Sequence, residues 1–135
     1  MRLVIDSNLV FSSILKPAFV PATVLGAWRA GHFDWISYEI QPAELKTAST
    51  RPYLLKKILE GFKPVAELFH EMQEDCYWPK LVMPLAAICR DPRDDYLFAL
   101  YDQGHVDLII SGNKDVLACK GNYPILTARE LIDRL

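Results

Sequence analysis

Short apolar runs alternate with helical stretches along nearly the whole chain. The first run, Leu3–Ile5, is rich in β-branched residues, ends at Asp6 and is typical of a strand buried on both faces. Further short strands are predicted at residues 33–37, 80–83, 106–111 and 124–127. Strands that alternate with helices favour a parallel sheet covered by helices on both faces, so we expect an α/β fold.

Apolar residues at helical spacing predict the helices between these strands. The predicted helices cover residues 22–31, 42–49, 52–62, 64–76, 91–104 and 127–135. Pro42 suits the first turn of its helix. Asp91 and Pro92 suit the N-cap and first position of theirs. Thr127 and Glu130 have the spacing of a capping box, which marks the start of the last helix.

The composition narrows the class of protein. A chain of 135 residues favours one domain, residues 1–135. The net charge of −2 gives no overall basic field for nucleic acid, although a local basic patch is compatible with it. Three cysteines without CxxC spacing disfavour disulfides and a zinc site, and favour a reducing cytosol. We expect neither a signal segment before Asp6 nor a membrane span.

Polar residues at the ends of predicted strands are candidate functional residues. In open parallel sheets, sites form at the carboxyl ends of the strands. Asp6 follows the first strand, and Ser111 and Asn113 follow the apolar run that ends at Ile110. Asp6 would also serve as a simple cap of the following loop, because aspartate side chains bond nearby backbone groups.

Two predicted helices add further acids. Glu44 lies in the first turn of the helix at 42–49, where a glutamate also interacts favourably with the helix dipole. In the helix at 91–104, Asp94 shares a face with the apolar residues three, four and seven positions on, so it should point along the buried side. Asp95 is rotated by about 100° onto a more exposed row.

Asp6, Glu44, Asp94 and the segment 113–115 are all placed to reach one cleft. Within that segment, the Asn113 carbonyl oxygen and the Asp115 carboxylate are potential ligands, although both also suit a polar helix start. Three or more carboxylates close together raise each other's pKa. A divalent cation removes the repulsion, and hard oxygen ligands suit Mg²⁺ or Mn²⁺. Asp6 is then explained as a metal ligand.

These motifs resemble those of the PIN-domain family, in particular the bacterial branch of toxin components in toxin–antitoxin pairs. The similarity lies in an isolated helical acid, Glu44, and in VIDSNLVFSS, RDPRDDYLFAL and DLIISGNKDVL. It implies a three-layer α/β/α sandwich with a central parallel sheet, an acidic Mg²⁺ or Mn²⁺ site and a ribonuclease directed at single strands. It also implies RNA as substrate, a cognate antitoxin as partner and a homodimer or higher homo-oligomer.

The match to the family covers three acids and two supporting polar residues: Asp6, Glu44, Asp94, Asn8 and Ser111. The chain departs from the family at Asn113, where an aspartate is usual. One negative charge is therefore missing from the expected site, and Asp115 is expected to replace it in part. Asp95, next to Asp94, is assigned a supporting role.

The reaction that follows from this set is metal-assisted phosphodiester hydrolysis. Asp6 and Asp94 would hold an ion that polarises the phosphate, and Glu44 would complete the ligand set or orient the attacking water. A second ion, about 3.5–4 Å away, would stabilise the leaving oxygen. Basic residues expected to track the RNA backbone are Arg51, Lys56 and Lys57.

Two alternatives stay open at this stage. Asp6 would be the nucleophile in a phosphatase similar to the haloacid dehalogenases, but Asn8 stands where those enzymes have their general acid. A PIN-like module that binds RNA or a protein without cleaving is the second alternative, and the missing charge at Asn113 keeps it open.

Overall fold

The computed structural model describes residues 1–16, 18–48, 50–52, 56 and 65–135. At its centre lies a four-stranded sheet with the order β2-β1-β3-β4, in which all neighbouring strands are parallel. The strands are β1 Arg2–Ile5, β2 Asp34–Trp35, β3 Leu108–Ile110 and β4 Ile125–Leu126. The two central strands are therefore the apolar runs that precede Asp6 and Ser111.

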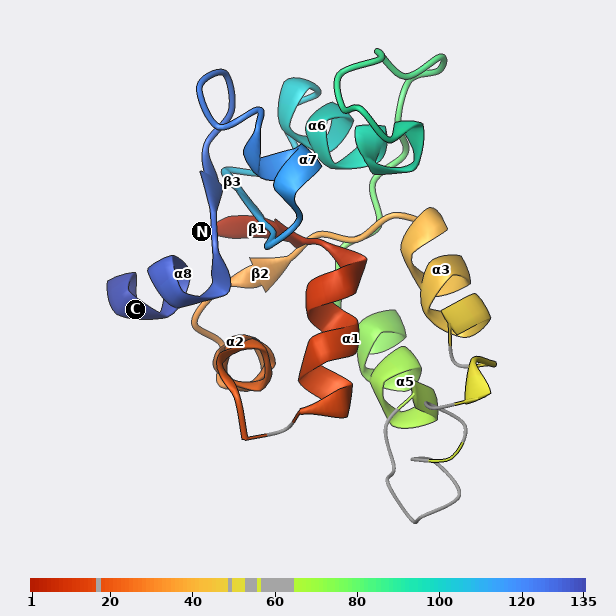
Figure 1. Cartoon of the computed structure of the whole chain (residues 1–135), viewed down its shortest axis with the longest axis vertical. Coiled ribbons are helices and arrows are strands. Elements are labelled where there is room, and N and C mark those ends of the chain that lie inside the picture. The colour runs from red at the N-terminus through yellow and green to blue at the C-terminus, as the bar shows by residue number, and fades with distance from the viewer. Residues whose placement is uncertain (17, 49, 53–55, 57–64) are drawn as a thin grey trace.

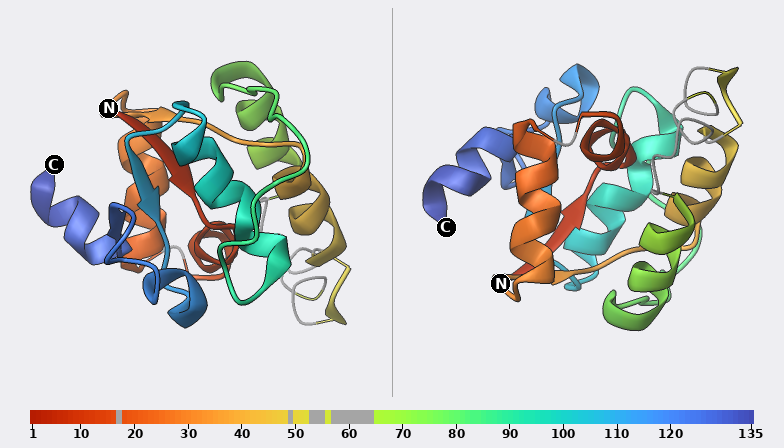
Figure 2. Two further views of the ribbon diagram at one scale, coloured as in Figure 1. Left: turned by 90° about the horizontal axis from the view of Figure 1, so that it is seen from above. Right: turned by 90° about the horizontal axis from the view of Figure 1, so that it is seen from below.

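Helices cover both faces of this sheet (Figures 1 and 2). They are α1 Ser7–Leu15, α2 Val20–Arg29, α3 Ile40–Ala48, α5 Val65–Asp75, the 3-10 turn η1 Pro92–Asp94, α6 Asp95–Asp102, α7 Lys114–Leu117 and α8 Ala128–Arg134. The chain is a three-layer α/β/α sandwich, as the sequence predicted.

Successive residues of the central strands point into different cores. Leu3, Ile5 and Ile110 belong to one apolar cluster, which α1, α2, α5 and α8 cover. Val4 and Ile109 belong to the other, which α6 and α7 cover. Side chains alternate between the two faces of a strand, so a strand buried on both faces must be apolar at every position. This explains the continuous apolar run of β1.

Two predicted helix starts are confirmed by their hydrogen bonds. The Asp91 carboxylate accepts a hydrogen bond from the Arg93 backbone N–H at 3.0 Å and caps η1. At the start of α8, the Thr127 hydroxyl accepts from the Glu130 N–H, and the Glu130 carboxylate accepts from the Thr127 N–H. These caps depend only on residues three positions apart or fewer, so the sequence alone specified them.

Helix α1 is an element that the sequence analysis did not predict. Asp6 is its N-cap, and its apolar side chains reach the core on the side of α2. The two helices pack against each other.

Within the described ranges, no single helix is long and apolar enough to cross a membrane. Only α1 and α2 taken together, across a bend of 102°, meet the length and composition of a span.

The strand predicted at residues 80–83 was wrong. No strand forms there, and the side chains of Val82 and Met83 are exposed. Prolines at 79 and 84 flank the segment, and neither can donate a backbone hydrogen bond to a ladder. One other prediction needs revision, because the helix expected at 91–104 begins as a 3-10 turn before α6. The helix expected at 52–62 lies largely outside the described residues and stays a prediction.

Candidate functional site

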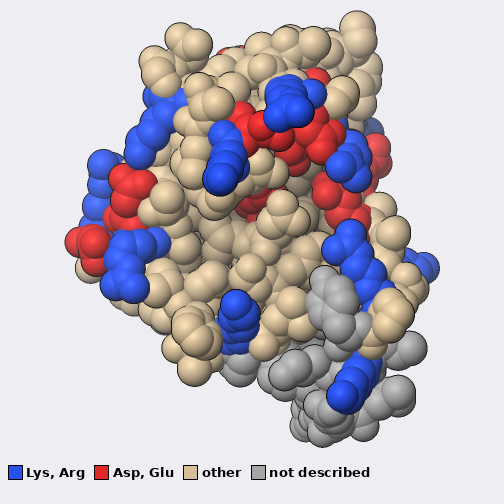
Figure 3. All heavy atoms as spheres, in the orientation of Figure 1, with Lys and Arg blue, Asp and Glu red and all other residues tan. Residues whose placement is uncertain are grey.

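A cavity of about 430 Å³, here named the acid cavity, lies where β1 and β3 end. Asp6, Glu44 and Asp94 all line it, although they come from the end of β1, from α3 and from η1. Acidic side chains gather in the upper half of the face shown in Figure 3, with basic side chains around them. The fold therefore brings the three predicted acids together.

Asp6 is buried, with 3% of its surface exposed. One carboxylate oxygen accepts the Asn8 backbone N–H at 3.2 Å, and the other accepts the Ser111 hydroxyl at 2.6 Å. Burial raises the pKa of Asp6, and the two hydrogen bonds oppose that rise. Asp6 is thus both the cap of α1 and a wall of the acid cavity, so the two readings of this residue are compatible.

Ser111 links the ends of the two central strands. Its side chain is completely buried, and its hydroxyl both donates to Asp6 and accepts the Asn113 backbone N–H at 3.0 Å. Asn8, the other residue with a predicted supporting role, supports Asp6 through its backbone. Its exposed side chain lines the acid cavity instead.

Glu44 has the most unusual environment of the three acids. Its Oε1 atom is buried and has no hydrogen-bond partner among the described residues. Burial, followed by repulsion from Asp6 and Asp94, raises the pKa of Glu44 to about 7. One turn earlier on α3, the buried Gln41 side chain donates to the carbonyl oxygen of Ile5. That bond ties the helix of Glu44 to the strand that carries Asp6.

Asp94 ends η1 and its carboxylate makes no capping hydrogen bond with α6. Burial, then repulsion from Asp6, raises the pKa of Asp94 to about 6. The charge crowding expected from the sequence is present, but burial raises the pKa of Asp94 more than repulsion does.

The prediction that Asp95 lies on an exposed row was wrong, because only 7% of Asp95 is exposed. It does not line the cavity; it accepts the backbone N–H groups of Ile88 and Cys89.

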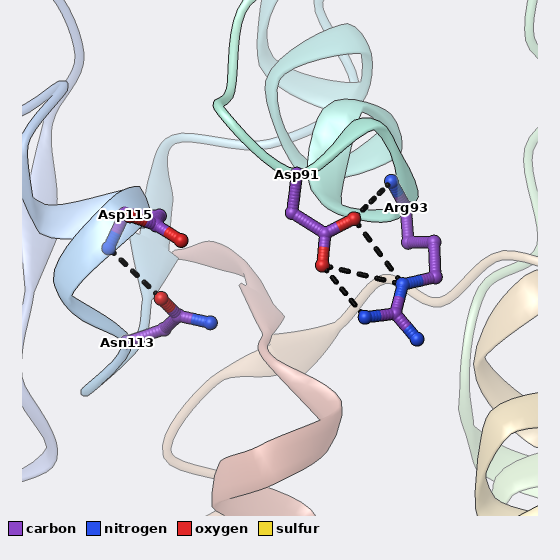
Figure 4. A network of polar contacts seen from close by, with 4 residues as sticks. All are labelled: Asp91, Arg93, Asn113 and Asp115. Carbon is purple, nitrogen blue, oxygen red and sulfur yellow. Dashed lines mark hydrogen bonds and ion pairs between the residues drawn. The ribbon is translucent and has the colours of Figure 1, made fainter.

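Asn113 faces Asp91 and Arg93 across the acid cavity (Figure 4). Its Oδ1 atom accepts the Asp115 backbone N–H at 2.9 Å and caps α7. The side-chain oxygen is therefore used by the helix, and the amide nitrogen points away from it. Asp115 does not line the cavity, and its carboxylate lies 3.7 Å from the Arg90 guanidinium. A metal-binding role for Asp115 stays a prediction.

Sequence reasoning missed the cation at the mouth of the cavity. Arg93 lines the cavity and is held by Asp91, with the closest nitrogen–oxygen distance at 2.8 Å (Figure 4). The Arg93 charge lowers the pKa values of Glu44 and Asp94, against the larger opposing effects. Asp91 was identified only as a cap, and an arginine two residues later was the available signal. Arg51 also lines the cavity, whereas Lys57 lies outside the described residues.

The donor chemistry of the acid cavity fits a divalent cation. Its acids offer only oxygen ligands. One of these oxygens, Glu44 Oε1, is buried and has no hydrogen-bond partner among the described residues. Among the described residues, no three Asp, Glu, His or Cys side chains are arranged to enclose one ion directly. Mg²⁺ usually keeps several waters and takes only one or two carboxylates directly. The residues therefore suit a hydrated ion of this type better than a closed protein cage.

Comparison with known proteins gives one match. A family model described as PIN domain matches residues 2–115. This range includes every lining residue of the acid cavity. No curated protein and no solved structure matches the chain.

Proposed function

The chain belongs to the PIN-domain family, and from this premise we propose that it is a Mg²⁺- or Mn²⁺-dependent ribonuclease. Family membership indicates a nuclease-type fold and supports hydrolysis of phosphodiester bonds in general. The ion and RNA as the substrate are the parts that we propose. The observation that carries the proposal is the acid cavity, where the carboxylates of Asp6, Glu44 and Asp94 converge and the buried Glu44 Oε1 atom has no hydrogen-bond partner among the described residues.

Asp6 and Asp94 are proposed to hold the ion. When bound, the ion would supply Lewis-acid chemistry, polarising the phosphodiester and increasing the acidity of an attacking water. Ser111 fixes the orientation of Asp6 through its 2.6 Å hydrogen bond, so that the carboxylate is held ready without rearrangement. Glu44, which has a pKa raised to about 7, is suited to accept a proton from water near neutral pH.

Arg93 is proposed to contact the phosphate backbone. Its guanidinium is exposed at the mouth of the cavity, and the Asp91 carboxylate limits the conformations it can adopt. An acidic cavity repels a polyanion, so a cation beside it lowers the cost of bringing a phosphate close. Arg51, on the side of α3, would act in the same way.

The biological role that we propose is the toxin component of a toxin–antitoxin pair in the cytoplasm. It rests on the resemblance of the motifs and not on a feature of the acid cavity. A cognate antitoxin and self-association as a homodimer or higher oligomer belong to the same proposal. Expression of the native chain should arrest growth of the host cell, and the Asp6→Asn variant should not. Growth arrest by both proteins would show that toxicity does not depend on the Asp6 carboxylate of the acid cavity.

A cleavage assay tests the ribonuclease. Native protein is incubated with mixed structured RNAs in Mg²⁺, in Mn²⁺ and in EDTA, beside Asp6→Asn and Asp133→Asn. Asparagine caps a helix about as well as aspartate, so Asp6→Asn should keep α1 while it removes the charge and replaces the oxygen that accepts the Ser111 hydroxyl by an NH₂ group, which cannot accept. Asp133 is exposed on α8, away from the cavity, and provides the matched control. Cleavage that depends on the ion and on Asp6, but not on Asp133, supports the proposal; equal cleavage by Asp6→Asn contradicts it.

A non-cleaving RNA-binding module is the second candidate, and Asn113 favours it. The amide at this position presents no charge to the cavity, and its oxygen already caps α7. Tight RNA binding without turnover in Mn²⁺ would support this alternative. The phosphatase alternative, with Asp6 as nucleophile, is disfavoured by the family match, and failure to trap an aspartyl-phosphate would exclude it.

A further inference from the structure

A second cavity, of about 380 Å³, adjoins the acid cavity and is here named the flanking cavity. The two cavities share Asn8 and Asn113 in their linings. On its far side the flanking cavity is bounded by the start of α2 and the first turn of α8. The proposed phosphodiester site and this second space are therefore neighbours, with two asparagines common to both linings.

The two cavities differ in chemistry. Among the described residues, no carboxylate lines the flanking cavity, and its walls include Leu9, Val20, Pro21 and Ala128. Its volume lies within the roughly 300–1,000 Å³ typical of small-molecule sites. An apolar space with a few polar groups suits a flat heterocycle that has hydrogen-bonding edges, whereas the acid cavity suits a phosphate with its counterion.

The polar groups at its border are available for a ligand. The Asn8 side chain makes no hydrogen bond with any described residue, and the Asn113 amide nitrogen is directed away from the α7 cap. Both amides could therefore meet the edge of a base. Arg129, also in the lining, is exposed and forms no ion pair with a described residue. Its guanidinium is free to bind a phosphate.

We propose that the flanking cavity is a nucleotide subsite for single-stranded RNA. It holds the unstacked base next to the scissile phosphate, and Arg129 contacts the following phosphate. The inference rests on the proposed function, because it takes the acid cavity as the place of cleavage. A base can enter the cavity only after leaving its stack, which makes an unpaired strand the required substrate form. Asn8 and Asn113 would then be specificity-determining residues between the two cavities.

Gly112 offers a way to fill this cavity without straining the backbone. It lies in the lining, a Cβ at this position would have no atom within 4 Å, and its φ is outside the left-handed range. Gly112→Phe should therefore fold and occupy the space that we assign to the base. Gly112→Ala makes the same change in the backbone without filling the cavity and is the matched control.

Arg129 has a control on its own helix. Arg134 is exposed in the last turn of α8 and does not line the flanking cavity. Arg129→Gln and Arg134→Gln each remove one positive charge, so any effect of net charge is the same in both. The lost phosphate contact should reduce the slope of log affinity against log salt by about 0.7 for a single strand, in Arg129→Gln only.

The test measures binding and cleavage separately. Binding of a short single-stranded RNA is followed by fluorescence anisotropy in Mn²⁺, in an Asp6→Asn background that should leave the RNA intact. We expect Arg129→Gln to weaken binding by about fivefold, the change expected for one net hydrogen bond, and Gly112→Phe to weaken it by at least as much because the base loses its contacts in the cavity. The two controls should bind normally. RNAs with one abasic nucleotide should lose affinity at a single position, beside the bond that native protein cleaves.

The outcomes distinguish the two proposals. If native protein cleaves RNA but Arg129→Gln and Gly112→Phe bind like their controls, the subsite is wrong and the ribonuclease stands. If native protein does not cleave but both variants weaken binding and one abasic position matters, the ribonuclease is wrong and the base-binding cavity stands. Equal affinity for the single strand and its duplex, or no binding of RNA at all, overturns the subsite.

Discussion

Asp94 and Asp95 are neighbours in the chain and are almost equally buried, with 8% and 7% of their surfaces exposed, yet they are used in opposite ways. The Asp95 carboxylate accepts the backbone N–H groups of Ile88 and Cys89 at 3.0 and 2.8 Å. Asp94 makes no capping bond, faces two other acids and has a pKa raised to about 6. Burial alone therefore does not identify a functional acid.

The same difference separates the two regions to which these residues belong. The loop that Asp95 holds is a satisfied polar region, in which a buried charge is matched by donors. The acid cavity is only partly satisfied: both oxygens of Asp6 accept hydrogen bonds, but Glu44 keeps a buried oxygen without a partner among the described residues, and all three acids have raised pKa values. Unpaired buried charge is costly to a protein, and the divalent ion that we propose at the ends of β1 and β3 would supply the missing partner.

The largest effect is expected from Asp94→Asn on cleavage. Loss of a charged ligand should reduce the turnover of RNA by about 100-fold or more, the scale seen when one group that stabilises a transition state is removed. The free energy of unfolding should stay the same or increase, because a crowded carboxylate becomes neutral. Turnover and urea denaturation are measured on the same protein, with Asp133→Asn as the control. Normal turnover in Asp94→Asn would remove Asp94 from the site.

Asp95→Ala should show the reverse pattern, with a large loss in the free energy of unfolding and a small loss of turnover. Two backbone N–H groups, one buried and one partly buried, would lose their acceptor, which should cost about 2–4 kcal/mol in the free energy of unfolding. Asp95→Asn retains one oxygen and should cost less. Urea denaturation measures both values, and cleavage under folding conditions should be affected far less than in Asp94→Asn. A loss of turnover equal to that of Asp94→Asn, with normal stability, would give Asp95 the site role.

The acid cavity should also make stability depend on pH. Because the pKa of Glu44 is raised from 4.5 to about 7, the folded protein binds more protons than the unfolded chain between these values. In the absence of divalent ions, stability should therefore fall as pH rises from about 4.5 to 7, by about 1 kcal/mol after allowance for solvent screening. Melting temperatures across this range measure the effect, and Glu44→Gln should reduce it.

Millimolar Mn²⁺ should reverse this loss at pH 8, because an ion that binds only the folded protein stabilises it by mass action. A melting temperature that does not respond to Mn²⁺ would count against a metal site. The Asp95→Ala variant keeps the three acids and should respond to Mn²⁺ as the native protein does.

The smallest effect is expected from Asn113→Asp. Aspartate caps a helix as well as asparagine does, so one oxygen should still accept the Asp115 N–H while the second adds charge on the cavity side. We expect metal binding a few-fold tighter and equal or higher turnover, measured by titration and by cleavage. Weaker metal binding would show that the amide at this position is required.

Asp115→Asn, made in the native chain and in Asn113→Asp, tests the expectation that Asp115 compensates for the missing acid. Groups that share one ion give non-additive effects, so Asp115→Asn should reduce metal binding and turnover more in the native chain than in Asn113→Asp. Small and additive effects would leave Asp115 only as the partner of Arg90.

The sequence by itself determined what depends on near neighbours. The cap at Asp91 and the capping box at Thr127 were predicted from spacings of three residues or fewer, and the bonds are present. The apolar run of β1 identified a doubly buried strand, and the alternation of strands and helices gave the parallel sheet. In such a sheet all carboxyl ends lie along one edge, so Asp6 and Asn113 were correctly expected near each other.

Only the tertiary structure decided which polar groups have partners. The donors to Asp95 come from a loop six and seven residues earlier, and helical periodicity cannot show that such a loop folds back. Ser111 meets Asp6 across 105 positions of sequence, because β1 and β3 are adjacent in the sheet. Residues 80–83 have the composition of a strand but no neighbouring strand to pair with. Hydrogen-bond satisfaction is a property of the assembled chain, and here it distinguishes Asp95, whose carboxylate accepts two backbone N–H groups, from Asp94, which makes no capping bond, and Glu44, which keeps a buried oxygen without a partner among the described residues.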